Sequence, residues 1–132
     1  MQVSLNARGP AEPSEVWDRY VRPGRWPEWS PQLRRVSYDG GPTLTVGRTG
    51  RVYGPLGVSA GFLITAVAPA ERRWSWRVTA GRIGLDLTHA VEPDGAAAAG
   101  GTRTTLTIEG PAPIVLGYLP LAQLALQRLV RA

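Results

Sequence analysis

The sequence predicts an α+β fold in which a curved antiparallel sheet of about seven strands wraps around a long C-terminal helix. Residues 33–108 form successive short strand-like runs separated by glycine, proline and aspartate, which is typical of antiparallel hairpins. Residues 113–131 instead have the period of a helix. Two short segments between the first strand and the remaining strands are predicted to be helical. The length predicts one domain, 1–132.

The N-terminal part contains one strand and two short helices. Apolar and polar residues alternate over 3–8, which predicts a half-buried strand that ends at Gly9-Pro10. Residues 13–20 place their apolar side chains on one face of a helix. Prolines in 26–31 restrict the second helical segment to a short helix or turn.

Six further strands complete the predicted sheet. Turn residues follow each of them, and the loop 94–101, with four consecutive alanines, is expected to be mobile because it can bury little apolar surface. The predicted strands are 33–38, 44–53, 58–67, 73–79, 83–91 and 103–108.

The predicted C-terminal helix, 113–131, is about 28 Å long at 1.5 Å per residue and can cross the domain. Pro120 removes one internal hydrogen bond and is expected to kink the helix. The alternative is a membrane span, but the apolar run is too short and is interrupted by Pro120 and two glutamines, so we expect none. The face expected to pack inward comprises Ile114, Tyr118, Leu121, Ala125 and Leu129.

Composition excludes several kinds of site. The chain has no cysteine, which excludes disulfides, thiolate zinc sites and cysteine nucleophiles. One histidine, scattered carboxylates and the lack of a nucleotide-binding glycine pattern predict no metal and no cofactor. The net charge is +5, but its basic residues are scattered arginines, so we expect no nucleic-acid binding. The N-terminus has no pattern of a secretory signal, which favours a cytoplasmic location.

Several motifs follow the same order as these elements. They are Val16-Trp17, Trp26-Pro27-Glu28-Trp29-Ser30-Pro31, Leu44 to Gly47, Pro69 before Trp74-Ser75-Trp76, His89, and Gly101-Thr102-Arg103-Thr104-Thr105. With that order, they resemble the START-like superfamily, also called the SRPBCC or Bet v 1-like helix-grip fold, and within it the polyketide cyclase/dehydrase branch. The resemblance covers essentially the whole chain and implies an internal cavity. It does not imply one reaction, because the family includes aromatase/cyclases, lipid-transfer proteins, hormone receptors and co-chaperones.

The predicted strand 83–91 carries the only histidine. Alternation places His89 with Leu85 and Leu87 on the face toward the helix. Desolvation at this position would lower the pKa of His89 and favour the neutral imidazole that a general base requires. The alternative is a core histidine that bonds a hydroxyl or a backbone group. Asp86 lies on the opposite face, so no Ser-His-Asp triad is predicted.

Large apolar side chains are expected to line the cavity. Trp74 and Trp76 alternate with polar residues and should face inward, either to stack on a flat ligand or to fill the core. Trp26, Trp29 and Tyr118 are candidates for the rim of the cavity. The predicted ligand-binding set is Trp26, Trp29, Tyr38, Phe62, Trp74, Trp76, Leu85, Leu87, Leu106, Tyr118 and Leu121.

The sequence leaves open which face of strand 44–53 points inward. Arg51 and Tyr53 share one face, Val52 lies on the other, and neither face is purely apolar. An inward Arg51 would stabilise an enolate or carboxylate, whereas an outward one is an ordinary solvated residue. The candidate catalytic residues are therefore His89, Arg51 and Tyr53.

Two functions fit these predictions. The first is a cofactor-independent cyclase or dehydratase of secondary metabolism, whose cavity folds a polyketide-like chain while His89 moves the proton beside a carbonyl. The second is a non-catalytic carrier or sensor of a lipid or aromatic metabolite. A protein-interaction role is a weaker third hypothesis, because the sequence does not indicate an exposed apolar or strongly charged patch. We expect an apolar or aromatic small-molecule partner, and a monomer or homodimer.

Overall fold

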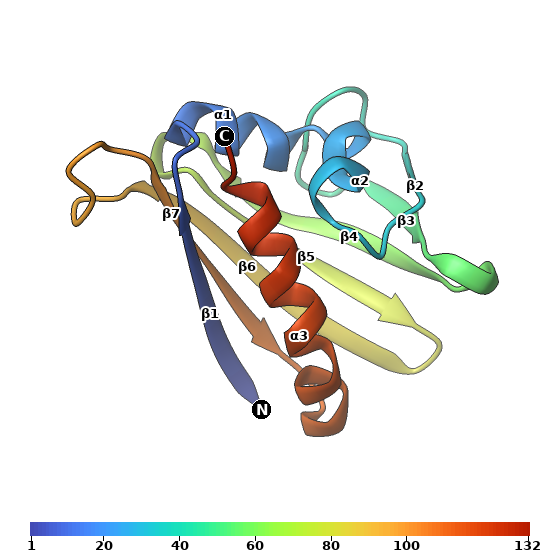
Figure 1. Ribbon diagram of the computed structural model, residues 1–132. Coiled ribbons are helices and arrows are strands. Elements are labelled where there is room, and N and C mark those ends of the chain that lie inside the picture. The colour runs from blue at the N-terminus through green and yellow to red at the C-terminus, as the bar shows by residue number, and fades with distance from the viewer.

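The computed structural model describes residues 1–132 and contains an antiparallel sheet with helices on one face (Figure 1). The elements are β1 (Gln2–Gly9), α1 (Pro13–Val21), η1 (Pro23–Arg25), α2 (Trp26–Trp29), β2 (Arg35–Tyr38), β3 (Thr49–Tyr53), η2 (Pro55–Gly57), β4 (Ser59–Ala68), η3 (Pro69–Glu71), β5 (Arg73–Ala80), β6 (Ile83–Pro93), β7 (Thr102–Glu109) and α3 (Ala112–Leu129). The seven strands are ordered β1-β7-β6-β5-β4-β3-β2. The predicted α+β class and the order of its elements are confirmed.

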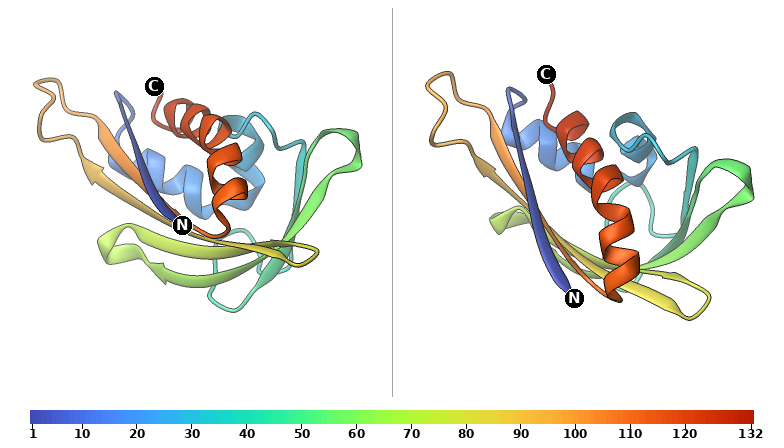
Figure 2. Two further views of the ribbon diagram at one scale, coloured as in Figure 1. Left: turned by 90° about the horizontal axis from the view of Figure 1, so that it is seen from below. Right: turned by 60° about the horizontal axis from the view of Figure 1, so that its bottom comes forward.

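The helices form one layer against the concave face of the sheet. Figures 1 and 2 show α3 crossing this face, while α1 and α2 cover the end near the C-terminus. Two indole N–H groups fix α2 to α1: Trp26 donates to the Tyr20 carbonyl at 2.8 Å, and Trp29 donates to the Arg19 carbonyl at 3.2 Å. The core therefore lies between the sheet and two helical covers, one formed by α1 and α2 and the other by α3.

Residue alternation predicts the inward faces of the last three strands correctly. Each buries every second side chain, as expected for strands with one face in a core. The buried inward positions are Trp74 and Trp76 on β5, Leu87, His89 and Val91 on β6, and Thr102, Thr104, Leu106 and Ile108 on β7.

The predicted strand 44–53 is shorter than expected, since β3 begins only at Thr49. The preceding residues form a loop in which the N–H of Arg48 donates to the Thr45 carbonyl at 3.2 Å. Gly47 has a φ of +88°, a left-handed conformation that interrupts a strand. The Gly47 N–H still donates to the Ile64 carbonyl at 2.8 Å, which holds the loop against β4.

The buried face of α3 agrees only in part with the predicted one: Ala125 and Leu129 are buried as expected, but two of the five predicted residues are not. Ile114 and Leu121 were expected inward but are 37% and 43% exposed, whereas Val115, Ala122 and Leu126 are buried. Apolar residues occur all around this helix, so their period does not determine its rotation. The helix continues through its internal proline, and Figure 2 shows it bending along its length. None of the helices combines the length and hydropathy that a membrane-spanning segment requires.

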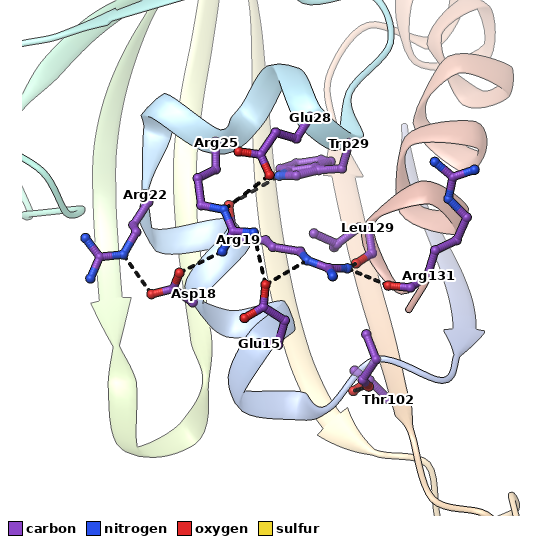
Figure 3. Close-up of polar contacts among 11 residues, drawn as sticks. Glu15, Asp18, Arg19, Arg22, Arg25, Glu28, Trp29, Thr102, Leu129 and Arg131 are labelled. Carbon is purple, nitrogen blue, oxygen red and sulfur yellow. Dashed lines mark hydrogen bonds and ion pairs between the residues drawn. The ribbon is translucent and has the colours of Figure 1, made fainter.

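An ion-pair network on α1 anchors the end of α3 (Figure 3). The Arg19 guanidinium donates to the carbonyls of Leu129 at 2.6 Å and Arg131 at 2.7 Å, and its Nε donates to Glu15 at 3.3 Å. Arginine at a helix C-terminus satisfies carbonyls that have no partner within the helix. Further pairs join Arg25 to Glu15, Asp18 and Glu28, and Arg22 to Asp18. The two helical covers are thus held together.

Candidate ligand cavity

A cavity of about 400 Å³ lies between α3 and the concave face of the sheet. Sixteen of its 22 wall residues are hydrophobic, and its size is within the range of small-molecule sites. Ala122 and Ala125 form part of the α3 wall, opposite larger side chains such as Leu87 and Leu106.

Nine of the predicted site residues line this cavity. They come from the region of α2, from three strands and from α3, so the fold brings together residues that are far apart in the sequence. Whether they contact a ligand remains a prediction. The nine are Trp26, Trp29, Trp76, Leu85, Leu87, His89, Leu106, Tyr118 and Leu121.

Three other predicted ligand-binding residues lie outside the cavity wall, which corrects their assignment. Phe62 and Trp74 are 3% and 1% exposed and pack in a continuous aromatic cluster. Tyr38 stacks on Phe62 with ring centroids 6.0 Å apart, and its hydroxyl accepts a hydrogen bond from the Thr45 N–H at 2.8 Å. The indole of Trp26 on α2 packs against both Phe62 and Trp74. These rings therefore fill core space beside the cavity.

His89 lies in the cavity wall, where its imidazole is held on two sides. Trp74 stacks on it at 4.5 Å with an interplanar angle of 8°, and Trp76 Nε1 donates to His89 Nε2 at 3.0 Å. An indole N–H only donates, so Nε2 carries the lone pair and the proton is assigned to Nδ1, which is buried without a protein partner. Burial lowers the pKa of His89 from 6.5 to about 3. The ring is therefore neutral near pH 7, and its lone pair already accepts a hydrogen bond.

The other two candidate catalytic residues lie on the far side of the sheet from His89, which is the outward alternative that the sequence left open for Arg51. Val52 is in the cavity wall, so the alternating Arg51 and Tyr53 face the convex side. Arg51 is exposed and donates to Ser59 Oγ at 3.0 Å, and the guanidinium of Arg35 lies 4.1 Å from the Tyr53 ring centre. The cavity thus brings neither residue near the imidazole.

Sequence reasoning missed Gln32, which lies in the loop before β2 and lines the cavity. Gln32 Nε2 donates to the Tyr118 hydroxyl at 3.4 Å, and Gln32 Oε1 is buried without a protein partner. Burial raises the pKa of Tyr118, so its phenol is neutral near pH 7. No local signal separates Gln32 from an ordinary loop residue, because its significance depends on a helix distant in the sequence. Within the whole chain, no group of three or more His, Asp or Glu side chains is arranged to hold a metal ion.

Solved structures with low sequence identity share this fold. The chain superposes on the di-domain ARO/CYC BexL from the BE-7585A biosynthetic pathway with a TM-score of 0.79 and 17% identity, over 98% of this chain and 45% of that one. The chain therefore spans less than half of the BexL chain. Ara h 8.0201 gives a TM-score of 0.74 and 12% identity, over 98% and 94% of the two chains. XoxI from Bacillus cereus gives 0.80 and 13%, over 98% and 92%.

The sequence itself matches a family described as polyketide cyclase / dehydrase and lipid transport, over residues 2–132. A comparison with curated proteins finds no match. The family match extends over nearly the full chain, and the structure has the curved sheet and the long terminal helix of the helix-grip fold. The chain therefore belongs to the polyketide cyclase/dehydrase and lipid transport family of the START-like superfamily.

Proposed function

We propose that this protein binds a flat apolar small molecule in its cavity, as a carrier or sensor that does not transform it. The observation that carries the proposal is the hydrogen bond from Trp76 to His89 Nε2 within an apolar wall. The bond engages the lone pair that a general base would use, while the hydrophobic wall supplies the free energy of binding through apolar burial.

A flat ligand suits the shape of this wall best. The indoles of Trp26, Trp29 and Trp76 all contribute to it, and aromatic faces favour stacked or edge-on contact with another ring. Because these indoles lie within the wall, their emission should change when a ligand binds. Titration with the neutral fluorophore N-phenyl-1-naphthylamine, followed by tryptophan emission, tests binding directly.

A wall substitution connects that binding to the cavity. Leu121 lies in the wall and is 43% exposed, so Leu121→Trp should occupy ligand volume and weaken probe binding at least about tenfold, with little change in melting temperature. Leu124→Trp is the matched control, because Leu124 is 50% exposed on the same helix but outside the wall. Equal loss of binding in both variants, or early melting of Leu121→Trp without a binding defect, would contradict the proposed cavity.

Native mass spectrometry of protein purified from its natural host distinguishes carriage from chemistry. A carrier or sensor should return its co-purified apolar ligand unmodified after incubation. Conversion of that ligand on incubation would contradict the non-catalytic proposal and favour an enzyme.

A cyclase or dehydratase is the second candidate, favoured by the family description and by the fold shared with the ARO/CYC di-domain. In this function the cavity would hold a polyketide-like chain in a reactive conformation, and His89 would release its bond to Trp76 before accepting a proton. Turnover of a polyketide-like thioester that His89→Ala abolishes, with probe binding retained, would support this candidate. Unchanged turnover in His89→Ala would remove the proton-transfer role.

A further inference from the structure

We infer that the cavity selects ligands that bear a hydroxyl group, and that Gln32 and Tyr118 together form the subsite for that group. This inference rests on the proposed binding function and adds the chemical class of the ligand. The subsite joins two elements, since Gln32 lies in the loop between α2 and β2 and Tyr118 lies on α3. Both side chains line the cavity, and Gln32 Nε2 lies 3.4 Å from the Tyr118 hydroxyl.

Gln32 has only part of its hydrogen-bonding capacity satisfied. Its Nε2 donates to Tyr118, but its Oε1 is buried and has no protein partner. A buried polar atom without a partner is uncommon in folded proteins, because it loses its hydrogen bonds to water without replacement. In the wall of a ligand cavity, a ligand group is the natural partner for such an atom.

The hydrogen-bonding pattern of the pair is the same for either orientation of the amide. With Nε2 toward Tyr118, the free groups are Gln32 Oε1, an acceptor, and the Tyr118 O–H, a donor. With the amide reversed, Oε1 accepts from the Tyr118 O–H, which leaves Nε2 as the donor and the phenol oxygen as an acceptor. Each arrangement presents at least one donor and one acceptor.

A hydroxyl group complements such a pair, because it donates one hydrogen bond and accepts another. A carbonyl or an ether only accepts, so it would leave the acceptor of the pair unsatisfied. The Tyr118 phenol is neutral near pH 7, because burial raises its pKa, and it therefore keeps its proton for this role. Most of the remaining wall is hydrophobic, which fits an apolar ring system with a hydroxyl substituent.

Three probes of the same ring system test this selection: 2-naphthol, 2-methoxynaphthalene and naphthalene. The intact protein should bind 2-naphthol about tenfold more tightly than 2-methoxynaphthalene, since each net hydrogen bond contributes a few-fold in affinity. Gln32→Leu and Tyr118→Phe should each reduce that preference to about threefold or less, while binding of 2-methoxynaphthalene stays within about threefold of that of the intact protein. Ser59→Ala is the control and should leave the preference unchanged, because it removes a hydroxyl that accepts a bond from Arg51 on the convex side of the sheet and does not face the cavity.

The outcomes separate this inference from the proposed function. Equal binding of all three probes would overturn the hydroxyl selection and leave the binding function supported. A preference that persists undiminished in Gln32→Leu would overturn the assigned subsite, and this variant alters a loop residue rather than the helix. Failure of every probe to bind the intact protein would overturn both proposals. The comparison of probes on the intact protein requires no variant to fold.

Discussion

The two ends of the space between the sheet and its helices are filled in opposite ways. Beneath α1 and α2, aromatic rings pack against one another, with Trp26 stacked on Trp74 at 5.7 Å and Tyr20 edge-on to Trp74 at 5.6 Å. Beneath α3, Ala122 and Ala125 face the sheet across a cavity of about 400 Å³. The same strands run under both ends, so the side chains of the helical covers decide which end is solid.

Strand β5 shows this division along one row of inward side chains. Trp74 belongs to the solid aromatic end, Val78 belongs to the cavity wall, and Trp76 contacts both. His89 lies at the same boundary, stacked on Trp74 and bonded to Trp76. The hydrogen bond to His89 fixes the orientation of the Trp76 indole, which forms part of the cavity wall.

The largest effect is expected from truncating the solid end. Trp74→Ala should lower the free energy of unfolding by about 3 to 5 kcal/mol, because it removes a buried indole and leaves a void among packed rings. Leu85→Ala in the cavity wall should cost less, below about 2 kcal/mol, since this partly buried side chain already borders empty space. Urea unfolding measures both. Equal costs would contradict the distinction between the two ends.

The link between the two covers gives the next prediction. Arg19→Met keeps the apolar stem but removes the bonds to the carbonyls of Leu129 and Arg131, and should cost about 2 kcal/mol. Amide exchange in the last turn of α3 should accelerate. Arg22→Met is the control: its pair with Asp18 is solvent-exposed, so its loss should cost less than about 1 kcal/mol. Unchanged exchange in Arg19→Met would mean that the contact does not anchor the helix.

Burial of His89 predicts a dependence of stability on pH. Its pKa falls from 6.5 in the unfolded chain to about 3 in the folded protein, so between these values the unfolded chain binds one more proton. Stability from this residue is therefore present above pH 6.5 and is lost as the pH falls toward 3. The free energy of unfolding should decrease by about 2 kcal/mol between pH 7.5 and 5, at 1.36 kcal/mol per pKa unit.

The variant His89→Gln isolates this contribution, because an amide oxygen can still accept the bond from Trp76 but does not titrate. Its stability should change much less over the same range of pH, which lies above the usual pKa values of carboxyl groups. Parallel curves for the two proteins, measured by urea unfolding, would show that His89 is not buried in its neutral form.

The inward faces of the strands and of α3 differ in how well the sequence predicts them. Strict alternation identifies the inward faces of β5 to β7, because one face of each strand is clearly more apolar. On β3 the two faces are similar in polarity, and Val52 is known to point inward only because it and its β4 partner Ala60 line the cavity, which leaves Arg51 outward. The buried face of α3 was predicted only in part for a similar reason, since its apolar residues surround the helix.

The polar part of the candidate site was beyond sequence reasoning. The contact between Gln32 and Tyr118 joins residues 86 positions apart, and neither has a local pattern that indicates the other. The bond between Trp76 and His89 was partly predictable, since alternation gives both residues the same inward face on adjacent strands. That Trp76 makes this bond, although Trp74 lies directly opposite His89 in the strand register, is known only from the three-dimensional structure.

The smallest effect on stability is expected where an added side chain has room. Ala125→Leu places three more carbon atoms at the cavity wall, so the free energy of unfolding should change by no more than about 1 kcal/mol. Ala7→Leu makes the same chemical change at an inward position of β1 that is about as buried, 2% exposed against 4% for Ala125, but lies outside the cavity wall, where overpacking should cost about 1 to 3 kcal/mol.

The order of the two variants should be reversed for binding of the apolar probe N-phenyl-1-naphthylamine, with the larger effect in Ala125→Leu. Ala125→Leu should weaken it, because the new side chain occupies ligand volume, whereas Ala7→Leu lies outside the wall and should leave the affinity of the folded protein unchanged. Chemical denaturation and probe titration of the same two variants measure both quantities. If Ala125→Leu were as destabilising as Ala7→Leu and bound the probe normally, the space beneath α3 would be packed core, and the contrast between the two ends would not exist.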